Sequence, residues 1–245
     1  MHQINLRKKF YIIIAVVISL CINCISIAAP IKNTEYILIT GFEPFGEHKT
    51  NSSWEAVRHL QGKQFSHKTI LVAQLPTVWE EAGKKLQVLI QKYHPVAVIA
   101  FGQAGKEPVR IELIAKNLRE NIKDNHAAFP TSLLISKSAP ATFKTTLDIR
   151  AIMQHLRQAE IPVVESSDAG RYLCNETFFI LMSDPGAQWA LKIPRGFVHV
   201  PSLNASVVTA KGYLVLFDAK KLEKTATIVV KAVAQSLSEK KPDQA

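Results

Sequence analysis

Short apolar runs alternate with longer amphipathic segments along most of the chain. Residues 96–101 are continuously apolar, which is typical of a strand buried on both faces of a sheet. Residues 80–93 carry apolar side chains at helical spacing, and the pattern ends before Pro95. By the same criteria we predict strands at 36–40, 68–74, 109–115, 162–165 and 196–200, and helices near 54 and at 147–160, 175–182 and 221–239.

This alternation predicts an α/β fold in which helices cover both faces of a mostly parallel, twisted sheet. In such folds the usable crevice lies at the carboxyl ends of the strands. Three predicted strand ends carry polar or reactive residues: the loop after Thr40, the segment after Phe101 and the end of the strand at 196–200. Residues 117–145 are irregular and polar, which is typical of a long functional loop.

The first residues of the chain have the regional order of a secretory signal peptide. Residues 7–9 are basic, residues 10–22 are apolar except for one serine, and small residues lead up to Ala28. We expect cleavage after Ala28, so that residues 1–28 are a signal peptide and residues 29–245 are a single mature domain, periplasmic or secreted. The alternative is an uncleaved leader that anchors the protein in the inner membrane, because the apolar stretch approaches the ~20 residues that span a bilayer.

The charge of the chain does not indicate a nucleic-acid partner. The formal net charge is +10, but the basic side chains are scattered rather than clustered with aromatic ones, as on an ordinary solvated surface. We expect no metal and no cofactor, because residues 29–245 contain no His-x-x-x-His or Cys-x-x-Cys pattern and residues 102–105 lack the Lys-Ser/Thr of a phosphate loop. No stable membrane partner is expected once the leader is removed, and the sequence leaves a homo-oligomer open.

Cysteine usage singles out one side chain. Cys21 and Cys24 lie in the leader, so residues 29–245 keep only Cys174 and cannot form an internal disulfide. A lone thiol in an oxidising compartment is a liability unless it is buried, pairs with another chain or reacts for a purpose. Cys174 stands where a polar loop becomes a predicted helix, and a helix N-terminus stabilises both a thiolate and an oxyanion. A buried structural cysteine is the alternative that this position leaves open.

His199 and Glu112 are the candidate partners of Cys174. A cysteine nucleophile needs an imidazole, and His199 lies near the carboxyl end of its predicted strand. Glu112 is considered as the carboxylate that orients that imidazole, as in a catalytic triad. The residues alone also allow a core histidine that serves packing, and a carboxylate that faces Arg110 or Lys116.

The loop after Thr40 is the most distinctive segment of the sequence. Phe42 and Phe45 stand on it between two glycines. Their rings either face a ligand or cap the hydrophobic core, and the residues alone leave both roles open.

Several short motifs, taken together, carry a resemblance to a known family. In their order and spacing the chain resembles pyroglutamyl peptidase I, the family of cysteine exopeptidases that remove an N-terminal pyroglutamate. The resemblance spans nearly all of residues 29–245 and implies an α/β/α sandwich. The matching stretches are 39–46, 51–57, 75–78, 102–105, 169–170 with 174–175, and 196–201.

The resemblance implies roles for particular residues. It places a Cys-His-Glu triad on Cys174, His199 and Glu112, the last because Asn117 follows five residues later, as in the family. Pyroglutamate has no free α-amine, so aromatic walls and a few hydrogen-bonding groups suffice for its pocket, and burying a charged amino terminus there would be costly. The substrate-binding residues that we expect are Phe42, Phe45, Thr77, Gln103, Tyr172 and Leu173.

The chain departs from the family pattern near the expected site. Lys106 and Glu107 stand where the family usually has Gly-Arg, and Glu176 replaces a usual histidine. An arginine that the family tends to carry after Asn117 is missing from its place, and Arg119 is the neighbouring candidate to substitute for it. These departures bear on the shape of the pocket and on the range of substrates.

The sequence therefore predicts a cysteine exopeptidase that acts on small peptides with a blocked amino terminus through an acyl-enzyme. One alternative is an amidase of the same fold that acts on a different blocked terminus. The other is a periplasmic binding protein that keeps the pocket and has lost turnover.

Overall fold

The structure, a computed structural model, describes residues 34–209 and 211–239. The predicted signal peptide, residues 1–28, lies outside the described residues, so its presence and its cleavage stay predictions. In the described ranges, no helix is both long enough and apolar enough to cross a bilayer.

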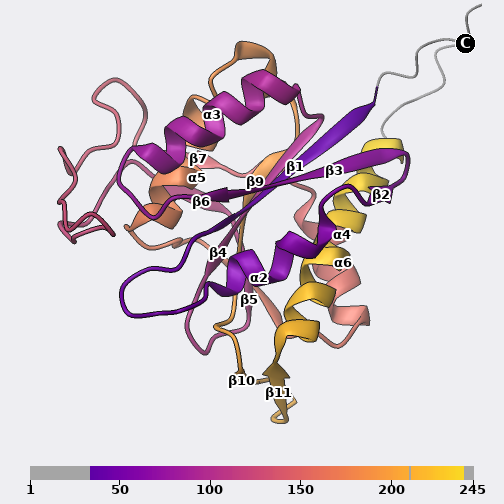
Figure 1. The fold of residues 1–245 in the computed structure, drawn as a ribbon. Coiled ribbons are helices and arrows are strands. Elements are labelled where there is room, and N and C mark those ends of the chain that lie inside the picture. The colour runs from indigo at the N-terminus through magenta and orange to yellow at the C-terminus, as the bar shows by residue number, and fades with distance from the viewer. Residues whose placement is uncertain (1–33, 210, 240–245) are drawn as a thin grey trace, which may run out of the picture. The chain divides into compact units, whose positions relative to one another are not determined.

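A central sheet of seven strands runs through the described residues (Figure 1). In chain order its strands are β1 (Glu35–Phe42), β2 (Gln64–Phe65), β3 (Lys68–Leu75), β4 (Ala97–Gln103), β5 (Val109–Glu112), β8 (Val163–Ser166) and β9 (Arg195–Val200). Their spatial order is β2-β3-β1-β4-β9-β5-β8. Strands β3, β1, β4 and β9 are parallel, whereas β2, β5 and β8 run in the opposite direction. The prediction of a mostly parallel sheet is confirmed.

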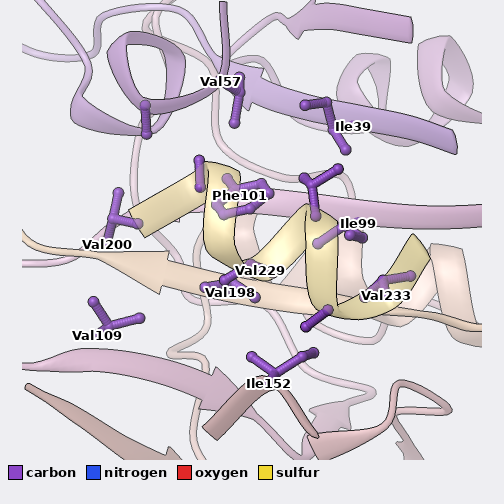
Figure 2. Close-up of a cluster of buried hydrophobic side chains, with 14 of the residues drawn as sticks. Ile39, Val57, Ile99, Phe101, Val109, Ile152, Val198, Val200, Val229 and Val233 are labelled. Carbon is purple, nitrogen blue, oxygen red and sulfur yellow. The ribbon is translucent and has the colours of Figure 1, made fainter. Parts of the chain in front are cut away.

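Helices cover both faces of this sheet, as predicted (Figure 1). The helices α2 (Ser52–Val57), α4 (Ile149–Gln158) and α6 (Ala219–Glu239) pack on one face, and α3 (Glu81–Tyr93) and α5 (Leu173–Ser183) pack on the other. Each face of the sheet therefore has its own core: the first lies under α2, α4 and α6, and the second under α3 and α5. The two-residue period of β1 places Ile37 and Ile39 in the first core and Leu38 in the second. Figure 2 shows the first core, in which the strand residues Ile39, Ile99, Phe101 and Val198 surround Val229 and Val233 of α6.

The prediction of a single strand at 109–115 is wrong, because the chain leaves the central sheet at Leu113. Residues Ile114–Lys116 form a separate strand, β6, which pairs antiparallel with β7 (Thr142–Lys144). At the break, the N–H of Leu113 donates to the carbonyl oxygen of Ser166 at 2.7 Å. The apolar alternation continues through the break, so periodicity alone does not reveal it.

The long segment predicted at 117–145 is irregular apart from β7. The 3-10 helices η2 (Arg58–Leu60) and η3 (Gln188–Lys192) were not predicted, and neither was an antiparallel hairpin of β10 (Ala205–Val208) and β11 (Leu214–Phe217). The hairpin is too short, and too apolar on its exposed face, to resemble a half-buried strand pair in the sequence.

Candidate active site

Cys174 is the second residue of α5, which begins two residues earlier than predicted. Among the described residues, no side chain caps the first turn of this helix, so its backbone N–H groups stay available to an anion. The preceding loop turns at Gly170, whose φ of +79° lies in the left-handed region that favours glycine. Cys174 is half-buried and lines a cavity, so its side chain is not sealed in the core.

Gly102 on β4 makes room for the sulfur of Cys174. A Cβ added at Gly102 would lie 2.9 Å from Sγ of Cys174 and 2.7 Å from the ring of Phe197. Both distances are too short for a carbon contact, so this position of the thiol requires glycine at residue 102. Glycine is needed at residue 102 because Cys174 and Phe197 approach its backbone closely, and not because of an unusual backbone angle.

His199 and Glu112 meet beside Cys174. His199 Nδ1 donates to Oε1 of Glu112 over 2.7 Å, and both side chains are buried. Cys174 and His199 line the same cavity, and the charge of Cys174 acts on the imidazole, whose second ring nitrogen, Nε2, is not used by Glu112. Although Glu112 is the last residue of β5, that strand runs against β9, so Glu112 lies opposite Phe197 and below His199. The three residues predicted as a triad are thus brought together.

Neighbouring charges set the protonation of His199. Burial disfavours the charged imidazole, but the negative charge and hydrogen bond of Cys174, followed by those of Glu112, outweigh burial and raise the pKa of His199 to about 9. Burial likewise acts to raise the pKa of Glu112, but the hydrogen bond and charge of His199 hold that pKa below its usual value. The geometry therefore favours an imidazolium paired with an ionised carboxylate at neutral pH.

Arg110 lies on the other side of Glu112. Its Nε is 3.2 Å from Oε1 of Glu112, and its Nη1 contacts the carboxylate of Glu107. The sequence left open whether Glu112 orients an imidazole or faces a basic residue, and in the structure it does both. Lys116 instead pairs with Asp168 at 3.0 Å.

A cavity of about 280 Å³ opens beside the thiol and the imidazole. It lies where β1, β4 and β9 end, so the cavity is at the carboxyl ends of the three strands that were expected to carry polar or reactive residues. Glu112 stands behind His199 and is not among the described residues that line the cavity. The lining includes Cys174, His199 and every predicted substrate-binding residue: Phe42, Phe45, Thr77, Gln103, Tyr172 and Leu173.

Aromatic rings form one end of the cavity. Phe42 packs on Phe197 with ring centroids 6.5 Å apart, and Phe45 lies 6.5 Å from Tyr172. Phe42 is only 3% exposed, so it caps the core and lines the cavity at once, and the two roles proposed for it are compatible. Burial, followed by the charges of Asp124 and Cys174, raises the pKa of Tyr172 to about 12, so its phenol stays neutral.

Residues 51–53 fix both the front loop and Gln103. Asn51 caps α2, since its side chain accepts from the N–H of Ser53. The hydroxyl of Ser53 in turn accepts from the N–H of Phe42 at 3.0 Å. Oε1 of Gln103 accepts from the N–H of Ser52 at 2.7 Å, which leaves the amide NH₂ of Gln103 to donate toward the cavity.

Thr77 is held against the same front loop. Its N–H donates to Oε1 of Glu43 at 2.8 Å, and its hydroxyl donates to the carbonyl oxygen of Glu43 at 3.1 Å. The motif at 75–78 therefore supports the loop that carries Phe42 and Phe45, as well as lining the cavity.

Sequence reasoning missed three charged residues of the cavity, Arg110, Glu120 and Arg171. Arg110 shares a strand face with Glu112, and this period-two relation was a usable signal. Glu120 and Arg171 lie in irregular segments that one backbone hydrogen bond joins, from the N–H of Glu120 to the carbonyl oxygen of Arg171 at 2.8 Å. No local pattern in the sequence predicts that bond.

The expectation that Arg119 substitutes for the missing arginine is wrong. Arg119 is not among the described cavity residues, and it forms a buried ion pair with Glu176 at 2.6 Å. The two departures from the family pattern, Arg119 and Glu176, thus neutralise each other. Among the described residues, no three His, Cys, Asp or Glu side chains are grouped as for a metal ion.

A thiol on a helix N-terminus that lines one cavity with a carboxylate-held imidazole defines the machinery of a cysteine peptidase on an α/β/α fold. Comparison with known proteins is consistent with that class and identifies the family within it. A family model described as pyroglutamyl peptidase matches residues 35–240. The chain belongs to the pyroglutamyl peptidase family.

Individual relatives agree with this assignment. The chain is 39% identical to pyrrolidone-carboxylate peptidase 1 of Ralstonia nicotianae over 178 residues, which cover 72% of this chain and 82% of the relative. The crystal structure of pyroglutamyl peptidase I from Bacillus amyloliquefaciens superposes with a TM-score of 0.74 at 32% identity, covering 82% of this chain and 97% of that one. A mutant pyrrolidone carboxyl peptidase from the hyperthermophile Pyrococcus furiosus gives 0.73 at 27% identity, covering 82% and 99%.

Proposed function

We propose that this protein is a cysteine exopeptidase that hydrolyses the amide bond after an N-terminal pyroglutamyl residue of small peptides. The observation that carries the proposal is the position of His199, whose Nδ1 is 2.7 Å from Oε1 of Glu112 and which lines one cavity with Cys174. The names of the relatives in the same family support the choice of substrate.

The Cys174 thiolate attacks the carbonyl carbon of the pyroglutamyl residue, and the carbonyl electrons move onto the oxygen. The N–H groups of the first turn of α5 stabilise that oxyanion. As the tetrahedral intermediate collapses, the carbon–nitrogen bond breaks and the imidazolium of His199 gives its proton to the leaving amine. His199 then deprotonates a water molecule, which attacks the thioester carbonyl. Collapse of this second tetrahedral intermediate releases pyroglutamate and restores the thiolate and the imidazolium. Glu112 keeps the imidazole in one orientation throughout.

The aromatic end of the cavity is suited to the lactam ring. Phe42, Phe45 and Tyr172 offer apolar surface for its methylene groups. The amide NH₂ of Gln103 is directed toward the cavity because its oxygen is engaged by Ser52, so Gln103 donates to the lactam carbonyl. The neutral lactam needs no ionic partner, which suits walls that are mostly apolar at this end.

Replacing the nucleophile tests the proposal. Cys174→Ala abolishes release of a fluorogenic amine from a pyroglutamyl amide, and its melting temperature stays near that of the wild type because the thiol is only half-buried. Continued turnover by a correctly folded Cys174→Ala protein would contradict the mechanism. Cys174→Ser, with the same shape and a weaker nucleophile, is the matched variant, and it keeps at most a small residual rate.

Two measurements separate the alternative functions. A panel of pyroglutamyl, acetylated and formylated peptides identifies an amidase of other specificity, which would prefer one of the latter two. A binding protein without turnover would gain thermal stability from pyroglutamyl amides, hydrolyse none of them and react slowly with iodoacetamide at Cys174.

We also propose that residues 1–28 direct export and are removed after Ala28, which places the mature enzyme in the periplasm or outside the cell. Support comes from the order of basic, apolar and small residues in the sequence. N-terminal sequencing of the protein from the fractionated host is expected to begin at Ala29. A membrane-bound protein that still begins at Met1 would favour the uncleaved anchor.

A further inference from the structure

The order of the strands gives the cavity two chemically different ends. Strands β1, β4, β9 and β5 are neighbours in that order, and each contributes one lining residue: Phe42, Gln103, His199 and Arg110. The cavity therefore runs from an aromatic end at β1, past the imidazole, to a guanidinium at β5. The reaction centre lies between the two ends.

Arg110 is the direct cross-strand neighbour of His199. The antiparallel pairing of β5 with β9 places the two residues opposite each other, where side chains on one face lie within contact distance. The Arg110 side chain is 23% exposed, so it is held in place and still accessible from the cavity. Its contacts to Glu107 and Glu112 use Nη1 and Nε, and neither uses Nη2.

The charge of the cavity lining is also suited to an anion. Besides the nucleophilic thiolate of Cys174, the charged lining residues are Arg110, Arg171, His199 and Glu120, so cations outnumber anions, and His199 is held in its cationic form by its neighbours. Glu120 and Arg171 are both exposed at the rim, where water screens them, whereas Arg110 is mostly shielded. The partly buried cation is therefore the one with the strongest influence on a bound peptide.

The position of the scissile bond then shows which part of the substrate lies at each end of the cavity. If the lactam ring occupies the aromatic end and its carbonyl carbon meets Cys174, the leaving nitrogen lies at His199, which protonates it. The residue that carries this nitrogen must continue away from the aromatic end, toward β5. Its side chain and its carboxyl group come next to Arg110.

We propose that Arg110 is a specificity-determining residue that binds a carboxylate on the residue after pyroglutamate. This inference rests on the proposed function and adds the second residue of the substrate to it. An Asp or Glu side chain supplies such a carboxylate, and so does the free carboxyl terminus of a pyroglutamyl dipeptide. Planar guanidinium donors match a carboxylate better than any neutral side chain does.

Glu107 is the internal competitor for this site. It contacts Nη1 of Arg110, but its side chain is 56% exposed, and an exposed ion pair of this kind is readily exchanged for another partner. An incoming carboxylate displaces Glu107 or binds beside it on Nη2. Removing the charge of Glu107 therefore strengthens the preference for acidic substrates, while removing the charge of Arg110 abolishes it.

Matched peptides test the proposal as ratios of kcat/KM on the mature chain. Amidated peptides that differ only in Glu, Gln or Lys after pyroglutamate report on the side chain. Pyroglutamyl-alanine and its amide report on the terminal carboxylate. The wild type is expected to prefer Glu over Gln about tenfold, as for a single charge-assisted contact, and to disfavour Lys. In Arg110→Gln the Glu-to-Gln ratio falls to about one, and in Glu107→Gln it rises above the wild-type value.

Ratios measured within one variant cancel any effect of Arg110 on Glu112 and on the chemical step, because such an effect is common to all substrates. Arg110→Lys keeps the charge and retains part of the preference, which covers the case in which Arg110→Gln folds poorly. A wild-type ratio near one for both pairs, or a ratio that Arg110→Gln leaves unchanged, overturns this inference alone. Failure of every pyroglutamyl peptide to react overturns the proposed function and this inference with it.

Discussion

Two fully buried glutamates, Glu112 and Glu176, lie close to the nucleophile and behave in opposite ways. Burial acts to raise the pKa of both carboxyls. For Glu112, His199 and Arg110 outweigh burial and the pKa falls. For Glu176, burial prevails over the Arg119 guanidinium and the pKa rises.

The two glutamates also differ in what their partners touch. Glu112 is bonded to His199, and His199 lines the cavity together with the reactive thiol of Cys174. Arg119 links Glu176 to the carbonyl oxygens of Ser132 and Leu134 in the long loop, away from the cavity. A buried charge therefore indicates chemistry only when its partner reaches a reactive group, and otherwise it holds the scaffold together.

Neutralising the catalytic carboxylate gives the largest expected effect. Glu112→Gln keeps the shape of the side chain but no longer stabilises the imidazolium, so kcat should fall by about 10³–10⁴-fold. Steady-state kinetics on a pyroglutamyl amide measure this, and circular dichroism checks the fold. Glu176→Gln is the matched control and should lose far less kcat. Equal losses in the two variants would erase the distinction between them.

Breaking the scaffold pair should instead lower stability. Arg119→Met leaves Glu176 without its cation, which is expected to cost about 3–5 kcal/mol in the free energy of unfolding. Removing both charges, in Arg119→Met with Glu176→Leu, should recover most of that loss because no unpaired charge remains buried. Urea denaturation of Arg119→Met, Glu176→Leu and the double variant gives the coupling free energy between the two side chains. An Arg119→Met protein as stable as the wild type would show that the pair contributes little.

The pH dependence of stability should separate the two pairs further. The folded-state pKa of His199 is about 9, above its ordinary 6.5, so the stability that it contributes is fully present below about pH 6.5 and is lost as pH rises through about 9. The expected loss is of order 1–3 kcal/mol. Glu112 has a depressed pKa, so its contribution is present above its ordinary value and is lost as pH falls through the folded one.

Urea denaturation between pH 6 and pH 10 measures the alkaline loss. His199→Gln should flatten this part of the profile, whereas Arg119→Met should leave its slope unchanged. A wild-type stability that stays constant across this range would contradict the imidazolium assignment.

The smallest effect on stability is expected for an exposed ion pair. Lys116 and Asp168 are 3.0 Å apart, but their side chains are 27% and 63% exposed. Lys116→Ala should change the free energy of unfolding by less than about 1 kcal/mol, because water and salt screen the pair. Thermal melts at low and high salt measure it. A loss as large as that of Arg119→Met would mean that exposure does not decide which pairs matter here.

Local pattern predicted most of the sheet and the helices, because residues 96–101 are continuously apolar and α3 has a clear apolar face. It failed at Leu113, where the chain changes sheets without any change in the apolar alternation. There Leu113 still donates to Ser166 of β8, whereas the following strand pairs with β7, and no local pattern contains these long-range pairings. The reversed direction of β5 and β8 follows from the same long-range pairing.

The predicted site residues came together because each lies in a motif at a strand end or a helix start. Family resemblance, rather than periodicity, selected Glu112 among the acidic residues. Arg119 misled the prediction because proximity in sequence to Asn117 does not decide which way a loop residue faces. Arg110 was missed as a cavity residue because its role depends on which strand lies next to β9.

The direct test of the central claim is alkylation of the mature protein with iodoacetamide, followed in parallel with hydrolysis of a fluorogenic pyroglutamyl amide in the presence of a reductant. Cys174 is the free cysteine of the described residues, so mass spectrometry of its peptide reports the fraction modified. Hydrolysis should be present at the start and should fall in proportion to modification of Cys174, with protection by excess substrate. Absence of hydrolysis by the reduced protein, or hydrolysis that survives complete modification of Cys174, would contradict a thiol-based mechanism.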